Sequence, residues 1–190
     1  MTDLILASTS PYRNALLQRL GLDFRCTAPF IDEAHRDDET PSARAIRLAR
    51  AKAEAVAVHE PEGVIIGSDQ VAHVGGVVLD KPGTPVRAIA QLRQMSGRCV
   101  EFLTAVCIIA GQRIEQDIVS ANVIMRNLSE AEIQRYVLRE QALDCSGSIR
   151  CEGLGITLFE SIRTPDPTAL IGLPLLTVTR RLRALGFDLP

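Results

Sequence analysis

The residues of this chain whose types could do chemistry are hydroxyls, cations and carboxylates that recur beside predicted strands and helices. The main candidates are Ser8, Ser10, Arg13, Glu33, Lys52, Asp69, Gln70, Lys81 and Glu152. The cations suit a polyphosphate, which needs positive groups at several points along its length. The carboxylates suit a hard divalent cation with oxygen ligands, the kind that bridges phosphates.

Motifs of several other enzyme classes do not occur in the sequence. There is no G-x-x-x-x-G-K-[S/T] and no G-x-G-x-x-G, which argues against a P-loop ATPase and a dinucleotide-binding dehydrogenase. A G-x-S-x-G nucleophile elbow does not occur either. Phosphate chemistry that uses a metal ion and carboxylates is therefore the class that remains.

Asp69 follows an apolar run, residues 64–66, which we expect to be a short buried strand that passes into a turn at Gly67-Ser68-Asp69. A carboxylate at the end of a buried strand is well placed for chemistry. Gly-Ser-Asp is also ordinary turn composition, because Asp can bond its own backbone. These residues alone leave both interpretations open.

Arg13 lies at the start of a predicted helix, about residues 11–20, which follows a predicted strand at 4–7. Ser10 is a good N-cap for it and Pro11 a good first residue. A strand that enters a helix through a small-residue loop presents N–H groups to an anion. A cation in the first helical turn opposes the helix dipole, and a bound phosphate would resolve that conflict. A solvated surface arginine is the alternative.

Lys52 lies within the apolar stripe of a predicted helix over about residues 41–58, four residues after Leu48 and four before Val56. Its ammonium could reach water while its stem packs, or it could enter a cleft. Glu33 belongs to an acidic, polar loop, where solvation is a sufficient explanation. Lys81 precedes a proline, which holds it extended.

Glu152 lies in a glycine-rich segment, residues 144–155, which permits close approach by a ligand. A conformationally demanding loop with a solvated acid is the alternative. The other predicted elements alternate between strands and helices, which favours an α/β fold with a mixed sheet in a single domain, residues 1–190. They are a short strand at 24–26, a hairpin over 71–79, helices at 84–96, 129–140 and 174–185, and strands at 100–109, 113–125 and 156–162.

Composition limits the remaining possibilities. A chain of 190 residues is long enough for one domain with a substantial core. The net charge of −2 provides no general attraction for nucleic acid, so an anionic ligand needs local cations. Five cysteines without a C-x-x-C pair argue against a disulfide framework and a zinc site, and favour a reducing compartment. We see no signal peptide or membrane span and expect a cytoplasmic protein.

Several motifs in order along the chain resemble the Maf family of nucleoside triphosphate pyrophosphatases. The opening motif is Leu6-Ala7-Ser8-Thr9-Ser10-Pro11-Tyr12-Arg13. The later ones are Asp32-Glu33, Arg50-Ala51-Lys52-Ala53, Ile65-Ile66-Gly67-Ser68-Asp69-Gln70-Val71, Lys81-Pro82, Ser96-Gly97, Ser146-Gly147-Ser148 and Ile171-Gly172-Leu173-Pro174. The resemblance covers nearly the whole chain, and so many ordered motifs are specific.

The resemblance implies a fold of two lobes around a bent mixed β-sheet with flanking helices, similar to inosine triphosphatase, with a cleft between the lobes and often in a homodimer. It implies hydrolysis between the α- and β-phosphates of a nucleoside triphosphate, which gives a monophosphate and pyrophosphate. Asp69 matches the family's proton acceptor. Tyr12, Gln70 and Glu152 match its substrate-specificity positions.

Gly67-Ser68-Asp69-Gln70, with Glu152-Gly153-Leu154-Gly155-Ile156, is similar to the branch of the family that acts on 7-methyl-GTP. The branch that acts on dTTP and UTP usually has Asp-Thr in place of Asp69-Gln70. Tyr12 could stack on the cationic base, and Glu152 could accept hydrogen bonds from its Watson–Crick edge. The alternatives are the same reaction on UTP or dTTP and a nucleotide-binding regulator of cell division with little turnover.

The mechanism that we expect uses these residues in three roles. Asp69, with Glu33, holds Mg²⁺ or Mn²⁺ against the phosphates, and Asp69 takes a proton from the attacking water. Lys52, Lys81 and Arg13 stabilise charge on the phosphoryl oxygens and the pyrophosphate leaving group. Ser8 and Ser10 join Arg13 in the phosphate-binding loop.

Overall fold

The computed structural model describes residues 3–190 and contains a seven-stranded mixed sheet with the strand order β2-β1-β3-β5-β6-β7, in which β4 pairs with β3. β1 is parallel to β2 and β3, and the other pairs are antiparallel. This arrangement confirms the expected α/β class with a mixed sheet. The strands are β1 Leu4–Ala7, β2 Arg25–Cys26, β3 Val64–Val74, β4 Val77–Leu79, β5 Cys99–Ala110, β6 Arg113–Met125 and β7 Phe159–Arg163.

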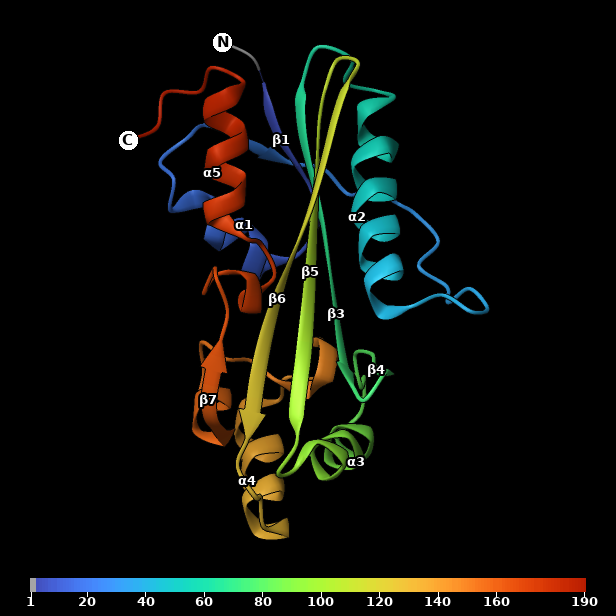
Figure 1. Ribbon diagram of the computed structural model, residues 1–190, viewed down its shortest axis with the longest axis vertical. Helices are drawn as coiled ribbons and strands as arrows, with labels where there is room; N and C mark the ends of the chain where they lie inside the picture. The colour runs from blue at the N-terminus through green and yellow to red at the C-terminus, as the bar shows by residue number, and fades with distance from the viewer. Residues whose placement is uncertain (1–2) are drawn as a thin grey trace.

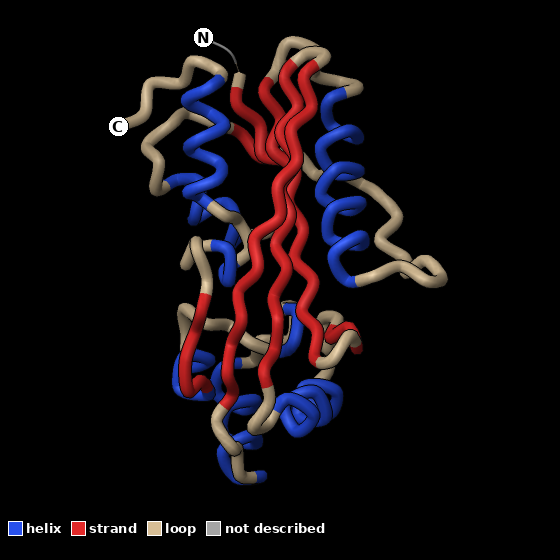
Figure 2. The backbone as a smooth tube through the Cα atoms, viewed as in Figure 1, coloured by secondary structure: helices blue, strands red, loops and turns tan. Residues whose placement is uncertain are grey.

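The helices gather in two groups at the two ends of the long strands β3, β5 and β6 (Figure 1). One group is α1, α2 and α5, and the other is α3 and α4, beside β7. Figure 2 shows that the long strands continue through both groups, which form the two lobes. The helices are α1 Pro11–Gln18, α2 Pro41–Ala57, α3 Pro85–Met95, α4 Glu130–Glu140 and α5 Leu175–Ala184, with short 3₁₀ turns at Ser146–Ser148, Leu154–Leu158 and Ala169–Ile171.

The first lobe has two buried apolar clusters, one on each face of the sheet, and the second lobe has one. In the lobe of α1, α2 and α5, alternate residues of β1 point to opposite faces of the sheet. Leu4 and Leu6 pack with α1 and α5, whereas Ile5 and Ala7 pack with α2. A separate cluster joins α3 and α4 to the far ends of the long strands. Among residues 3–190, no helix combines the length and the apolar composition needed to cross a membrane.

Two expectations about local structure were wrong. β3 does not end at Ile66, and the expected turn at Gly67-Ser68-Asp69 is regular strand, because every residue from Val64 to His73 pairs with β5. Turn-like composition is overridden here by a long antiparallel ladder. The expected strand at 156–162 starts only at Phe159, since Leu154–Leu158 form 3₁₀ turns. The other predicted elements occur within a few residues of their expected bounds.

Candidate active site

A cleft of about 440 Å³ lies where the two lobes meet, and every site residue suggested by the sequence lines it. Its walls come from the β1–α1 loop, the loop before α2, α2 itself, β3, the segment after β4 and the segment after α4. The cleft therefore brings together residues far apart in the sequence. The predicted residues that line it are Ser8, Ser10, Tyr12, Arg13, Glu33, Lys52, Asp69, Gln70, Lys81 and Glu152.

β3 presents Asp69 and Gln70 to two different neighbours because successive strand residues point to opposite faces. Gly67 and Asp69 face α2, where Asp69 pairs with Lys52. Ser68 and Gln70 face the turn at residues 169–172, with which both form hydrogen bonds. A continuous strand, rather than a turn, thus supplies both residues to the cleft.

Lys52 lies between two carboxylates, of which Asp69 is buried and Glu33 is half exposed. Its Nζ is 2.6 Å from Oδ1 of Asp69 and 2.7 Å from Oε1 of Glu33. Lys52 is only 6% exposed and Asp69 only 7%. The ammonium therefore pairs with two carboxylates rather than reaching bulk water, so snorkelling does not describe this lysine. The pairing also distinguishes Glu33 from the other acids of its loop.

The pKa of the Glu33 carboxyl reflects two opposing effects. Partial burial raises this pKa, whereas the hydrogen bond and charge of Lys52, with the charges of Lys81 and Arg13, lower it. The cations outweigh the burial, and the pKa lies below its usual value. Glu33 is therefore a carboxylate at neutral pH.

The β1–α1 loop offers hydroxyls and one guanidinium to the cleft. The Ser10 side chain caps α1 by accepting a hydrogen bond from the Arg13 N–H, and Ser8 Oγ accepts one from the Ser10 N–H. Arg13 Nε donates to the Gly172 carbonyl at 2.8 Å, so this arginine is not a solvated surface residue. Burial lowers its pKa, and the charges of Asp69 and Glu33 oppose that effect.

Gln70 uses its amide nitrogen inside the protein. Nε2 lies 3.1 Å from Thr104 Oγ1 and 2.9 and 3.0 Å from the carbonyls of Ala169 and Leu170. Three acceptors around one nitrogen fix the orientation of the amide. Of the Gln70 side-chain amide, only the oxygen Oε1 is therefore left for a ligand, and this oxygen accepts hydrogen bonds.

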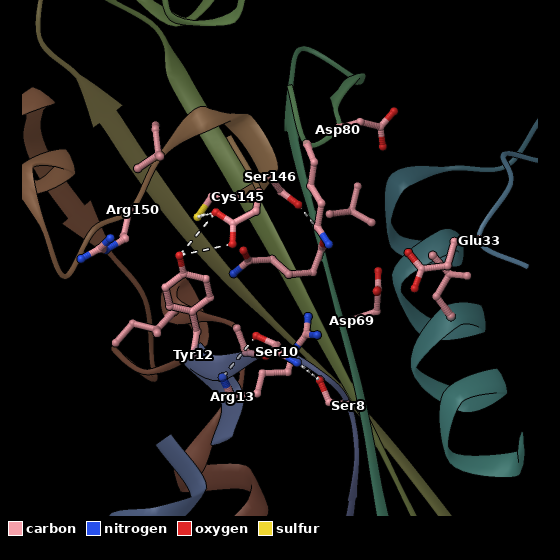
Figure 3. A pocket seen from close by; sticks show the side chains of 18 of the residues that line it. Ser8, Ser10, Tyr12, Arg13, Glu33, Asp69, Asp80, Cys145, Ser146 and Arg150 are labelled. Atoms are coloured by element: carbon pink, nitrogen blue, oxygen red, sulfur yellow. Dashed lines mark hydrogen bonds between the residues drawn. The ribbon is translucent and has the colours of Figure 1, made fainter. Parts of the chain in front are cut away.

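Tyr12 and the segment after α4 form the opposite wall of the cleft from Asp69 and Glu33 (Figure 3). The Tyr12 hydroxyl lies 3.4 and 3.5 Å from the two carboxylate oxygens of Asp144. Burial, and then contact with Cys145, raises the pKa of Tyr12, so the phenol stays protonated. Glu152 and Arg150 line the same end.

Comparison with known proteins identifies the family. Residues 3–185 match the family model described as Maf-like protein. The chain belongs to the Maf family. It is 54% identical to a 7-methyl-GTP pyrophosphatase of Xanthomonas oryzae pv. oryzae, and the alignment covers the full length of both chains. A 7-methyl-GTP pyrophosphatase of Polaromonas sp. is 52% identical over 98% of this chain and 86% of its own.

A likeness to a solved structure is weaker. The crystal structure of a nucleoside-triphosphatase / dITP/XTP pyrophosphatase from Mycobacterium abscessus aligns with 97% of this Maf chain and 97% of its own. The sequence identity is 15% and the TM-score 0.47.

Sequence reasoning missed a second charge cluster in this Maf cleft. Arg44 is buried on α2, and its Nη1 lies 3.0 Å from Oδ1 of Asp80. His35 Nε2 lies 2.9 Å from Oδ2 of the same carboxylate. Burial raises the pKa of Asp80, but the hydrogen bonds and charges of His35 and Arg44 lower it by more, so this pKa lies below its usual value. The cluster ties the Glu33 loop to the segment that carries Lys81. The sequence did contain one signal for this cluster, because Arg44 lies on the same buried face of α2 as Lys52.

The carboxylates of Glu33 and Asp69, which both contact Lys52, are one pair in the Maf cleft that could hold a metal ion. Among residues 3–190, no group of three or more His, Cys, Asp or Glu side chains has a metal-binding arrangement. Mg²⁺ commonly takes only one or two protein carboxylates and completes its shell with substrate phosphates and water. Two carboxylates in contact with one ammonium fit that requirement.

The Glu33–Lys52 pair makes a testable contribution to stability. Because the pKa of Glu33 is lowered in the folded protein, the contribution is complete above the unfolded value of about pH 4.3 and is lost as pH falls through the folded pKa. We expect Glu33→Gln to lower the free energy of unfolding at pH 7 by no more than about 1 kcal/mol, since Glu33 is half exposed. Urea unfolding at pH 7 and pH 3 should show the difference from wild type shrinking at pH 3. A difference that grows at pH 3 would contradict this assignment.

Proposed function

We propose that the protein hydrolyses the bond between the α- and β-phosphates of 7-methyl-GTP and releases 7-methyl-GMP and pyrophosphate. One observation carries the proposal. The cleft joins a cluster of cations and carboxylates at one wall to an aromatic side chain and acceptors at the other. The full-length similarity to relatives named 7-methyl-GTP pyrophosphatase supports the choice of base.

In the proposed reaction, Asp69 takes a proton from a water molecule whose oxygen attacks the α-phosphorus. The bond from that phosphorus to the bridging oxygen breaks, and pyrophosphate leaves with the electron pair. Lys52 holds the Asp69 carboxylate at 2.6 Å and so fixes its direction. Arg13 and Lys81 line the cleft where they can stabilise the charge on the leaving pyrophosphate.

We propose that Glu33 and Asp69 hold Mg²⁺ or Mn²⁺ when substrate is bound. Such an ion would neutralise phosphate charge and polarise the phosphoryl oxygens. Lys52 lies against both carboxylates, so it keeps them together before substrate arrives. Ser8 and Ser10 are proposed phosphate contacts, and Tyr12, Gln70 and Glu152 are proposed base contacts.

A substrate panel tests the proposed function. Pyrophosphate release is measured for 7-methyl-GTP, GTP, UTP and dTTP, each with Mg²⁺ and with Mn²⁺. We expect the highest kcat/KM for 7-methyl-GTP. Faster release from UTP or dTTP would overturn the choice of substrate. Tight binding of the triphosphates without pyrophosphate release would favour a nucleotide-binding regulator.

Three further proposals concern the whole protein. We propose that residues 1–190 form one catalytic domain, because the same sheet runs through both lobes. We propose a cytoplasmic location, which the five free cysteines support, since a reducing compartment keeps thiols free. We propose a homodimer on family resemblance alone, which light scattering can test. Neither nucleic acid nor a membrane is part of the proposed function.

A further inference from the structure

We infer that Asp144 is a further specificity-determining residue, which selects for the positive charge of a 7-methylated guanine. The inference rests on the proposed function and concerns the base end of the same cleft. Asp144 belongs to the segment that follows α4 and lines the cleft beside Tyr12. It is the first residue of the glycine-rich segment 144–155, but no motif singled it out within that segment.

The base end of the cleft carries uncompensated negative charge. Asp144 and Glu152 are both exposed, and neither forms an ion pair within residues 3–190. Arg150 is the nearby cation, but its Nε lies 3.2 Å from Oε1 of Glu140, whose side chain is only 6% exposed. Glu140 therefore offsets the charge of Arg150, and two carboxylates remain to face a bound base.

Asp144 also acts on the ring that would stack on the base. The Tyr12 hydroxyl lies 3.4 Å from Oδ1 and 3.5 Å from Oδ2 of the Asp144 carboxylate and can donate to either oxygen. A phenol that donates toward an anion becomes richer in electron density at its ring, because hydrogen-bonded groups polarise one another. A richer ring attracts a cationic base more strongly.

The polar atoms at this end of the cleft favour the Watson–Crick edge of guanine as well as the positive charge of the methylated base. Gln70 offers only its carbonyl oxygen, and the two carboxylates are also acceptors. The Watson–Crick edge of guanine carries N–H donors at N1 and N2, so it matches a wall of acceptors. Methylation at N7 adds a positive charge to the same base, and this charge is what Asp144 would distinguish.

The test compares charge selectivity in wild type and Asp144→Asn. We expect the ratio of kcat/KM for 7-methyl-GTP to that for GTP to fall about fivefold to tenfold, mostly through KM. GTP itself should change less than about twofold, because its base is neutral. Asp144→Glu should restore most of the ratio, since it keeps the charge. Glu160→Gln is the matched control, because Glu160 is an exposed acid on β7 outside the cleft.

Binding of the monophosphates gives a second readout that needs no turnover. The ratio of Kd for GMP to Kd for 7-methyl-GMP, measured by calorimetry, should fall by the same factor in Asp144→Asn. Unchanged ratios in both assays, or an equal loss for methylated and unmethylated nucleotides, would overturn the inference. A wild type that releases no pyrophosphate from 7-methyl-GTP would overturn the proposed function, and the binding ratios would still decide the role of Asp144.

Discussion

Asp69→Asn is expected to fold like the wild type and to lose about two to four orders of magnitude in kcat for pyrophosphate release. The amide is nearly the same size as the carboxylate, and β3 keeps its ladder with β5 on both sides of the position. The amide cannot accept a proton from water at neutral pH, and it is a poorer partner for Lys52 and for a divalent cation. Turnover is lost for a chemical reason rather than through unfolding.

The assay measures pyrophosphate release from 7-methyl-GTP, with circular dichroism to verify folding. Asp117→Asn is a suitable control because Asp117 is a β6 carboxylate that pairs with Arg180 and Arg181 outside the cleft. We expect that control to keep full turnover. Turnover of Asp69→Asn within about threefold of the wild type would contradict the role of Asp69 as general base.

Gly67→Ala is expected to damage both stability and activity. A Cβ on Gly67 would lie less than 3.0 Å from the Ala49 carbonyl oxygen and 2.6 Å from the Ala53 nitrogen. Both atoms belong to the backbone of α2, which cannot yield as a flexible side chain would. Helix α2 must move away from β3, and we expect a loss of about 3 kcal/mol in the free energy of unfolding.

The same displacement would separate the two halves of the proposed site, because Lys52 lies on α2 and Asp69 on β3. A shift of about 1 Å is expected to cost about a hundredfold in kcat/KM. Gly111→Ala is the control, since a Cβ there meets no atom within 4 Å and its φ of +58° adds only local strain. In urea unfolding and in the pyrophosphate-release assay, Gly111→Ala should lose less stability and less kcat/KM than Gly67→Ala. Wild-type kcat/KM in Gly67→Ala would contradict the close approach of α2.

Local signals in the sequence predicted much of the fold because the elements concerned begin with their own caps. Ser10, the expected N-cap of α1, accepts a hydrogen bond from the first turn of that helix, and Thr40 and Ser129 do the same for α2 and α4. The continuity of β3 was missed because Gly67 to Gln70 have turn-like composition. Their pairing partners lie on β5, far along the chain, and no local signal reports such a ladder.

The site shows the same division between local and distant information. Lys52 was singled out as a cation in an apolar stripe. Its contacts with Asp69 and Glu33 explain why a lysine occupies that position. The contact between Tyr12 and Asp144 joins residues that are 132 positions apart in the chain, and no periodicity or motif connects them. The sequence also indicated Gln70 without revealing that its amide nitrogen is bound to the 169–172 turn.

The products of the reaction test the central claim most directly. Wild-type protein is incubated with 7-methyl-GTP and Mg²⁺ in ¹⁸O-labelled water, and the products are followed by ³¹P nuclear magnetic resonance and mass spectrometry. The proposed cleavage predicts 7-methyl-GMP and pyrophosphate in equal amounts, with the label in 7-methyl-GMP, because water attacks the α-phosphorus. The appearance of 7-methyl-GDP and orthophosphate, or of label in pyrophosphate, would contradict it.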